Sequence, residues 1–345
     1  SLSNNFVMAL FEDSKGNIWI GTETGGVNML DPSTGIFNRH KSITADPFSI
    51  SNNNITSINE DVHGNIWIGT WGGGMNLYDP TSKRFIRFPT QHDEENGVVR
   101  NIFRTKNGDL FIGTHTGLKK LHQNDNEYFF STELRGGIFI DRSLSNVRIL
   151  SIMEDQHGHL WIGTENEGLF YLNTKTGKAT QYLRDSKVGF GLPSNSIWSL
   201  FTDEFGTVWI GSYDKGLFKI DPYEEKFTAL FQNNPFINSL SHNVVSSFAE
   251  DEHGNFWIGT DGGGVNYFNV QTQTFEHYRH NTNDPYSLSD DAVVSLTLDG
   301  QGNLWVGSWE GGVSILEKGK KKFKRLAERN GEPLHLSGND IHKVY

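Results

Sequence analysis

The sequence predicts an all-β protein, a seven-bladed β-propeller built of four-stranded antiparallel blades. Three observations lead to this fold class. A seven-residue stretch, seen as GNFWIGT at 254–260, occurs in seven closely related copies. The glycines that begin the copies are 44 to 50 residues apart. Each period holds short strands and turn residues without helical periodicity, which is typical of a propeller rather than of a helical solenoid.

The repeat accounts for nearly the whole chain, so we expect one domain over residues 1–331. Residues 336–344 have the same phase as residues 2–10. We therefore expect 332–345 to be a linker or the start of a following blade, and the ring to close by packing of blade 7 on blade 1 without strand exchange. The predicted blades span about 1–48, 49–92, 93–140, 141–188, 189–236, 237–285 and 286–331.

The sixth blade shows the expected elements in order. Four strands are predicted at 244–249, 255–259, 265–269 and 274–279. An Asp-x-x-Gly turn joins the first two, because the aspartate accepts backbone N–H groups and the glycine adopts positive φ. We expect a structural role, not calcium binding or catalysis, for the aspartates that begin these turns, namely Asp13, Asp61, Asp155, Asp203, Asp251 and Asp299.

Two further positions of the repeat are interpreted as core. Three residues after each leading glycine stands a large aromatic side chain, which we expect to wedge between adjacent blades. Seven residues before the glycine stands a small side chain, explained by crowding where the first strands converge rather than by nucleophilic chemistry. The aromatic residues are Trp19, Trp67, Phe111, Trp161, Trp209, Trp257 and Trp305, and the small ones are Ala9, Ser57, Ser151, Ser199, Ser247 and Ser295, with Asn101 in blade 3.

Composition excludes some classes of function. The chain has no cysteine, so disulfides and thiolate chemistry are excluded, and no apolar run of membrane-spanning length. The net charge of −11 is weak evidence about partners, since ten of the 41 acidic residues belong to the repeated turns. No secretory signal is visible and the sequence opens inside a repeat, so we expect a longer parent chain.

A candidate binding site lies where the second strand turns into the third. In a four-stranded blade this turn and the connection from the preceding blade emerge at the same end, which carries the more variable loops. Aromatic rings, carboxylates and a histidine there suit a sugar, which needs stacking and hydrogen bonds to its hydroxyls; a solvated rim of turn residues is the alternative. The predicted ligand-binding residues are Trp71, His115, Glu165, Tyr213, Asp261 and Trp309, with Trp198 and Arg100 from the first strands of blades 5 and 3, while Glu23 holds the same turn position in blade 1.

Blade 3 departs most from the repeat, and departures from a repeat are where function is expected. It has Arg100 on its first strand, Phe111 in place of tryptophan, and a long following segment at 133–146. Five of the twelve arginines form a basic sector that would suit an acidic oligosaccharide. Salt bridges to Glu133, Asp141 and Asp185 are the alternative. The sector comprises Arg100, Arg135, Arg142, Arg148 and Arg184.

Neither a metal nor a cofactor is predicted. His63, His157 and His253 occupy the same turn position in different blades, so they cannot converge on one ion. The basic stretch KGKKKFKR at 318–325 is interpreted as a solvated blade edge rather than a nucleic-acid site.

The blade pattern closely resembles the two-component regulator propeller repeat. The resemblance rests on I-x-x-I/F-x-E-D-x-x-G-N-x-W-I-G-T followed by G-G-x-N-x-x-D-P, and on the lead-in loops DPFSIS at 46–51 and DPYSLS at 284–289. It implies the periplasmic sensor region of a hybrid two-component histidine kinase, with no direct membrane insertion by this segment. The implied partners are an oligosaccharide and other domains of the parent sensor, with a dimer as one option. The kinase and DNA-binding parts are absent, so no enzyme activity is assigned to this segment.

Two other functions stay open at this point. A propeller glycosidase or lyase would need two carboxylates about 5–10 Å apart across a cleft, for which Glu165 with Asp261 or Glu23 would be candidates. A propeller without a small ligand, acting as a spacer or as a protein-docking module, is the third possibility.

Overall fold

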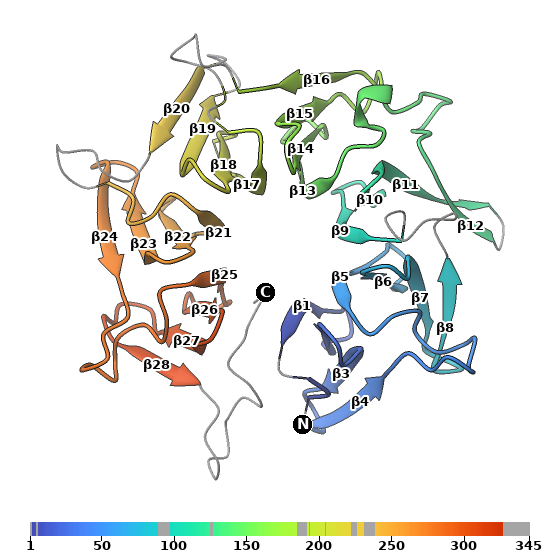
Figure 1. Cartoon of the computed structure of the whole chain (residues 1–345), viewed down its shortest axis with the longest axis horizontal. Coiled ribbons are helices and arrows are strands. Elements are labelled where there is room, and N and C mark those ends of the chain that lie inside the picture. The colour runs from blue at the N-terminus through green and yellow to red at the C-terminus, as the bar shows by residue number, and fades with distance from the viewer. Residues whose placement is uncertain are drawn as a thin grey trace. The chain divides into compact units, whose positions relative to one another are not determined.

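The computed structural model describes residues 2–4, 6–88, 97–124, 127–184, 192, 194–203, 205–221, 226–230 and 239–326. These residues form seven four-stranded sheets, and in each sheet neighbouring strands follow one another along the chain. The only helix among them is a single 3₁₀ turn at Arg142–Leu144. The fold is a seven-bladed β-propeller of antiparallel blades, as predicted (Figure 1).

The chain divides into two compact units. The four-blade unit comprises Met8–Arg184 and Asn195–Leu200, and the three-blade unit comprises Ser1–Val7, Asp185–Ser194 and Phe201–Tyr345. In the four-blade unit the first strands β1, β5, β9 and β13 lie on one side and the fourth strands β4, β8, β12 and β16 on the other (Figure 1). The first four blades contain β1 (Val7–Glu12), β2 (Ile18–Thr22), β3 (Val27–Asp31), β4 (Ile36–His40), β5 (Ile55–Glu60), β6 (Ile66–Thr70), β7 (Met75–Asp79), β8 (Arg84–Phe88), β9 (Val99–Arg104), β10 (Leu110–Thr114), β11 (Gly117–Asn124), β12 (Glu127–Ser131), β13 (Ile149–Glu154), β14 (Leu160–Thr164), β15 (Leu169–Leu172) and β16 (Ala179–Tyr182).

The remaining blades follow the same order. The strands predicted for the sixth blade are confirmed, with most boundaries shifted by one residue. The predicted linker at 332–345 lies outside the described residues, and the blade boundaries and the closure of the ring stay predictions. These blades contain β17 (Ile197–Thr202), β18 (Val208–Ser212), β19 (Leu217–Asp221), β20 (Lys226–Leu230), β21 (Val245–Glu250), β22 (Phe256–Thr260), β23 (Gly264–Asn269), β24 (Thr274–Tyr278), β25 (Val293–Leu298), β26 (Leu304–Ser308), β27 (Gly312–Leu316) and β28 (Phe323–Leu326).

The aspartate turns have the predicted structural role. Asp61 Oδ1 accepts the backbone N–H groups of His63 at 2.9 Å and Asn65 at 3.0 Å, while Gly64 has φ 81°. The second carboxylate oxygen has a role that the sequence analysis missed. It accepts the indole N–H of the blade's own tryptophan, as in Trp67 Nε1 to Asp61 Oδ2 at 2.9 Å, and the same bond occurs in the blades of Trp19, Trp209 and Trp305.

The aromatic residues wedge between blades, as predicted. Trp19 of the first blade packs edge-on against Tyr78 of the second with ring centroids 4.9 Å apart, and Trp67 meets Tyr128 of the third at 5.1 Å. Trp19, Trp67, Phe111, Trp161 and Trp209 are at most 4% exposed. Trp257 and Trp305 are only partly buried, so full burial is not uniform along the repeat.

Close approach between blades explains the glycine of the Gly-Thr pair. A Cβ on Gly69 would lie 2.7 Å from Val99 Cγ1 on β9, the first strand of the next blade. Gly69 also pairs with Ser57 on β5, and Ser57 Oγ accepts the N–H of Ile102 at 3.1 Å. The small residues are therefore packing positions, as predicted, and the crowding that selects them comes from the neighbouring blade.

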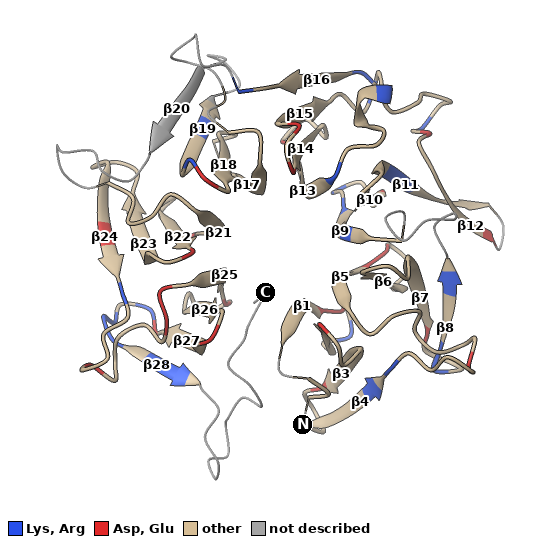
Figure 2. Ribbon diagram, viewed as in Figure 1, with Lys and Arg blue, Asp and Glu red and all other residues tan. Residues whose placement is uncertain are grey.

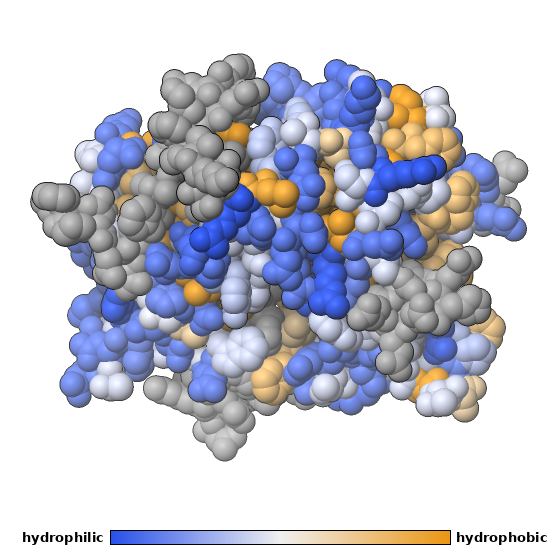
Figure 3. Space-filling view, turned by 45° about the horizontal axis from the view of Figure 1, so that its top comes forward, coloured by the Kyte–Doolittle hydropathy of each residue, from blue (hydrophilic) through white to orange (hydrophobic). Residues whose placement is uncertain are grey.

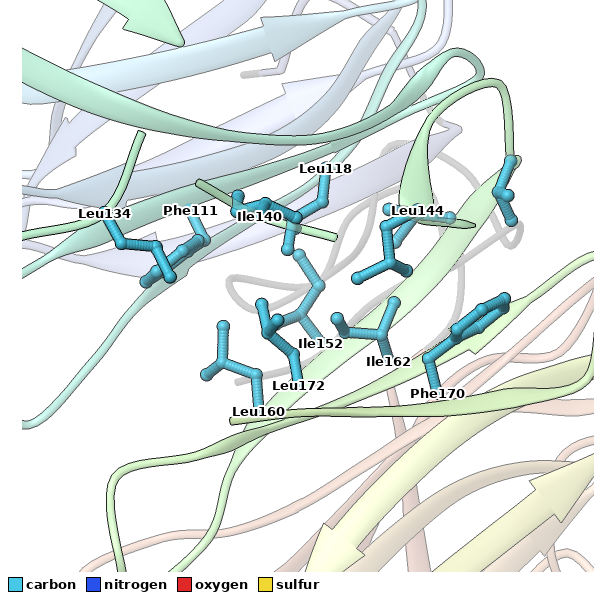
Figure 4. Close-up of a cluster of buried hydrophobic side chains, with 12 residues drawn as sticks. Phe111, Leu118, Leu134, Ile140, Leu144, Ile152, Leu160, Ile162, Phe170 and Leu172 are labelled. Atoms are coloured by element: carbon cyan, nitrogen blue, oxygen red, sulfur yellow. The ribbon is translucent and has the colours of Figure 1, made fainter. Parts of the chain in front are cut away.

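The long segment after blade 3 builds additional core. Leu134, Ile140 and Leu144 from this segment are buried against Phe111 and Ile152 of blades 3 and 4 (Figure 4). The segment is thus packed onto the scaffold.

Each lead-in loop is held by one arginine of the fourth strand. Arg87 donates to the carbonyl oxygens of Asp46 and Ser49 at 2.9 and 2.8 Å. Arg325 makes the same bonds to Asp284 and Ser287, both at 2.9 Å. These loops, which contributed to the family resemblance, are therefore structural.

The described surface visible in Figure 3 is mainly hydrophilic, with small separate apolar patches. The stretch 318–325 is an exposed edge, as interpreted from the sequence: its lysines form ion pairs such as Lys318 with Glu252 at 2.7 Å, and Phe323 is buried. In the described part of the chain, no helix reaches the length and hydrophobicity of a membrane span.

Candidate functional site

The turn after the second strand places its first residue equivalently in five blades. The N–H of Trp71 donates to the carbonyl oxygen of Asn54, the residue before β5, at 2.9 Å. The predicted ligand residues on these turns are therefore structurally equivalent, and they leave the sheet at the end that we call the loop end, where the preceding blade connects. The corresponding bonds are His115 to Val98 at 3.3 Å, Glu165 to Arg148 at 3.0 Å, Asp261 to Val244 at 3.0 Å and Trp309 to Ala292 at 2.9 Å.

Three predicted residues come together at the loop end of blades 2 and 3. Trp71 forms a β-bridge with Val98, and Arg100 lies two residues further along the same chain segment. Arg100 is the extra residue of a β-bulge between Val99 and Asn101, and its side chain lies over Trp71. Its Cζ lies 5.0 Å from the indole centroid, and the His115 ring stands edge-on to the indole at 5.3 Å. Trp71 is nevertheless 41% exposed as a residue.

A charged pair extends this group towards blade 4. Arg148 Nη1 donates to Glu165 Oε2 at 3.2 Å, and both side chains are about half-exposed. Burial lowers the pKa of Arg100, while the charge of the Glu165 carboxylate acts in the opposite direction. We call Trp71, Arg100, His115, Arg148 and Glu165 the rim cluster. Figure 2 shows its basic contributions on β9 and at the start of β13.

Four members of the rim cluster were predicted from the sequence as ligand residues, but the pairing of Arg148 with Glu165 was not predicted. The sequence positions could have indicated this pairing. In each of the five blades compared, the residue before the first strand is bonded through its carbonyl oxygen to the N–H of the residue that follows the Gly-Thr or Gly-Ser pair. Arg148 and Glu165 occupy these two places.

The other predicted site residues are exposed but belong elsewhere. Trp198 lies on β17 in the part of that strand assigned to the four-blade unit, at the repeat position of Arg100. Tyr213, Asp261 and Trp309 lie at the loop ends of successive blades of the three-blade unit, and all three are exposed.

The basic sector is not a single site. Arg135 Nη2 binds Asp109 Oδ1 at 3.0 Å, and Asp109 ends the turn between β9 and β10, at the opposite end of the blade from Arg100 and Arg148. The salt-bridge partners expected from the sequence were also wrong for these residues, since Arg135 pairs with Asp109 and Arg148 with Glu165. Asp185 lies outside the described residues.

Three cavities lie at the other end of the strands, the hairpin end. Each is set between two adjacent blades, with volumes of about 360, 350 and 250 Å³. They are lined by turn aspartates and blade aromatics, for example Asp251 and Trp257, Asp109 and Phe111, or Asp13 and Trp19. Since the same kind of cavity recurs between different pairs of blades, it follows from the way neighbouring blades pack and does not mark a specific site.

Among the described residues, no group of three His, Asp or Glu side chains is placed to hold a metal ion. His63, His157 and His253 each stand in the first turn of a different blade, and His157 and His253 are exposed.

The fold and the repeated turns define a class, a seven-bladed propeller made of seven versions of one unit. The family described as "two component regulator propeller" matches residues 1–24, 49–72, 143–166, 191–214, 239–262 and 287–310. The chain therefore carries two-component regulator propeller repeats, as the sequence resemblance indicated. The blade around residues 93–140, which supplies Arg100 and His115, is not among the matched segments.

The chain is similar to part of a histidine kinase and to solved propeller structures. The chain is 31% identical over 78 residues to histidine kinase P4 of Formosa agariphila, an alignment that covers 23% of this chain and 6% of the kinase. The extracellular domain of the putative hybrid two component system BT3049 from B. thetaiotaomicron is 21% identical with a TM-score of 0.51, covering 96% of this chain and 54% of that domain. Virginiamycin B lyase from Staphylococcus aureus is 11% identical with a TM-score of 0.61, covering 88% of this chain and 93% of the lyase. At these identities the two structures show a shared fold, and the chain spans only a small part of the kinase.

Proposed function

We propose that this chain is the periplasmic, ligand-sensing propeller of a hybrid two-component sensor histidine kinase, and that it binds glycan-derived oligosaccharides at the rim cluster. The repeats support the first part, together with the similarity to a histidine kinase and to the extracellular domain of a hybrid system. Phosphoryl transfer would then belong to other domains of the parent protein, and this segment would be a binding module.

One observation carries the second part, the exposed indole of Trp71 held between Arg100 and His115. A sugar ring presents C–H groups on one face and hydroxyls at its edge, so it needs a flat aromatic surface with polar groups beside it. Trp71 supplies the surface, and Glu165 and His115 supply polar atoms on neighbouring turns. Because its neighbours already hold the ring, little side-chain entropy would be lost on binding.

Calorimetry on the 345-residue chain with a panel of oligosaccharides tests this proposal. We expect Trp71→Ala to weaken binding about tenfold or more, or about 1.4 kcal/mol, with the unfolding midpoint unchanged because the side chain is exposed. Tyr286→Ala is the matched control, since Tyr286 is a similarly exposed aromatic residue on the lead-in loop at 284–289. The double variant Trp71→Ala/Trp309→Ala measures the contribution of Trp309, another exposed tryptophan.

Two outcomes would contradict the proposal. Unchanged binding in the double variant, or no oligosaccharide binding by the parent chain, would favour a spacer or protein-docking propeller. Release of shortened products from the oligosaccharides would favour a glycosidase or lyase.

A further inference from the structure

The rim cluster carries more positive than negative charge. It contains the guanidinium groups of Arg100 and Arg148 but a single carboxylate, that of Glu165. This is unusual in a chain with a net charge of −11. A local excess of positive charge at the loop end of a negatively charged protein indicates that these arginines serve a purpose.

Among the described residues, the guanidinium of Arg100 contacts an indole instead of pairing with a carboxylate. Its side chain is partly buried against Trp71, and among the described residues no acceptor takes a hydrogen bond from its guanidinium. Glu165 is close enough to act on it electrostatically, but the carboxylate is already paired with Arg148 at 3.2 Å. Removing a guanidinium from water without an acceptor is unfavourable, and a cation–π contact with one indole offsets only part of that cost.

The fold itself does not require a cation at this position. At the same place on the first strand, blade 2 has Thr56 and blade 6 has Ser246. Thr56 Oγ1 donates to the carbonyl oxygen of Val99, and Ser246 Oγ donates to that of Val293 at 2.7 Å, so each hydroxyl joins its blade to the next. Blade 3 gives up that bond and carries Arg100 instead.

We propose that the ligand bound at the rim cluster is an anionic oligosaccharide whose carboxylate or sulfate is held by Arg100 while the same sugar ring stacks on Trp71. This inference rests on the proposed function and narrows it to one chemical class. Carboxylate and sulfate share the geometry that a guanidinium recognises, two oxygen atoms facing two N–H groups. The anion would supply the acceptor that the protein does not, and Arg148 would stay paired with Glu165.

The experiment compares matched ligands and matched variants by calorimetry on the 345-residue chain. The ligands are uronate oligosaccharides and their carboxyl-reduced forms, and sulfated oligosaccharides and their desulfated forms. The key variant is Arg100→Thr, which restores the residue type of blade 2. Arg142→Thr is the control, since Arg142 is an exposed arginine of the 3₁₀ turn, away from the cluster.

We expect the parent chain to bind one anionic series about tenfold more tightly than its neutral counterpart. Arg100→Thr should remove that preference and leave the weaker neutral binding in place, while Arg142→Thr keeps the preference. Affinity for the anionic ligand should fall as salt rises, because salt screens exposed charges. The series that binds identifies the carboxylate or the sulfate as the recognised group.

Equal affinity for charged and neutral forms, or an unchanged preference in Arg100→Thr, would overturn this inference. If Trp71→Ala still weakened binding about tenfold in that case, the proposed function would stand and only the charge of the ligand would be wrong. If no member of either series bound, both the inference and the proposed function would fail.

Discussion

The indole of Trp67 donates to the carboxylate of Asp61 at 2.9 Å, and both side chains are buried. Blade 3 has neither residue, because Thr105 stands for the aspartate and Phe111 for the tryptophan. The two exchanges are complementary. A phenyl ring has no N–H to donate, and threonine lacks the second carboxylate oxygen that accepts the indole N–H in blade 2. Thr105 Oγ1 still accepts the N–H of Asp109 at 2.9 Å, so the turn keeps one of its bonds.

This pairing predicts a measurable coupling. Trp67→Phe should cost about 1–3 kcal/mol of unfolding free energy because it leaves a buried acceptor short of a donor, and Trp67→Ala about 3–5 kcal/mol through the cavity. The double variant Asp61→Thr/Trp67→Phe, which copies blade 3, should cost less than the sum of its single changes. The coupling free energy is obtained from urea unfolding of the parent protein, Asp61→Thr, Trp67→Phe and the double variant. Strictly additive losses of stability would show that the two residues act separately.

Arg100 shows how much of the site could be predicted at the residue scale. It stood out because other blades have Met8, Thr56, Leu150, Trp198, Ser246 or Val294 at its position. The departure from the repeat was visible in the sequence. Its contact with Trp71 was not, because that contact depends on how two blades lie side by side.

At the scale of elements, the next-to-last residue of the second strand is a glycine, and in five blades this glycine lets the first strand of the next blade approach closely. The backbone of Gly69 does not have positive φ, so alanine would cause no conformational strain there. Its Cβ would instead overlap Val99 Cγ1 at 2.7 Å.

We therefore expect Gly69→Ala to destabilise the protein by about 1–3 kcal/mol. Gly300→Ala is the control, since no atom lies within 4 Å of the added Cβ and its φ is not positive. Adding Val99→Ala should recover part of the loss by making room. The unfolding free energy of each variant is measured by denaturant unfolding. An unchanged stability of Gly69→Ala would mean that the spacing between blades adjusts freely.

Removing the arginine that holds a lead-in loop should increase the mobility of that loop alone. Arg87 holds the loop at 46–51 and Arg325 holds the loop at 284–289 through the same pattern of bonds. Arg87→Met should speed amide hydrogen exchange in the first loop only, and Arg325→Met in the second only. Each loop thus serves as the control for the other, and exchange that rises in both loops or in neither would contradict this assignment.

At the scale of the whole molecule, several groups titrate in the same direction on acidification. Hydrogen bonds from Trp305, Asn303 and nearby backbone lower the pKa of Asp299 to about 2. Burial on its own raises the pKa of Asp13, but hydrogen bonds from Trp19 and Asn17 outweigh it, and the net pKa is lowered. Burial also lowers the pKa of His40 and of His159, which favours their neutral forms.

The sign follows from proton binding. Each of these groups has a folded pKa below its unfolded one, so the unfolded state takes up more protons and stability falls as pH falls. We expect a first loss below about pH 6.5 from the histidines and a second between about pH 4 and pH 2 from the aspartates. His40→Phe should flatten the first phase and Trp305→Phe should weaken the second. Unfolding free energy measured against pH tests this, and stability that rises on acidification would contradict it.

The sequence by itself determined the fold class, the number of blades, the turns and the aromatic wedges. It could do so because each is encoded within one repeat, by an aspartate five residues before a strand or a ring three residues after a glycine, and the repetition makes the pattern clear. Only the tertiary structure decided which neighbours meet: Trp71 with Arg100, Glu165 with Arg148, and Arg135 with Asp109 at the other end of the blade. These pairings join separate segments of the chain and, for Trp71 and Arg100, different blades. Their separation depends on how the backbones pack against each other, which no single stretch of sequence contains.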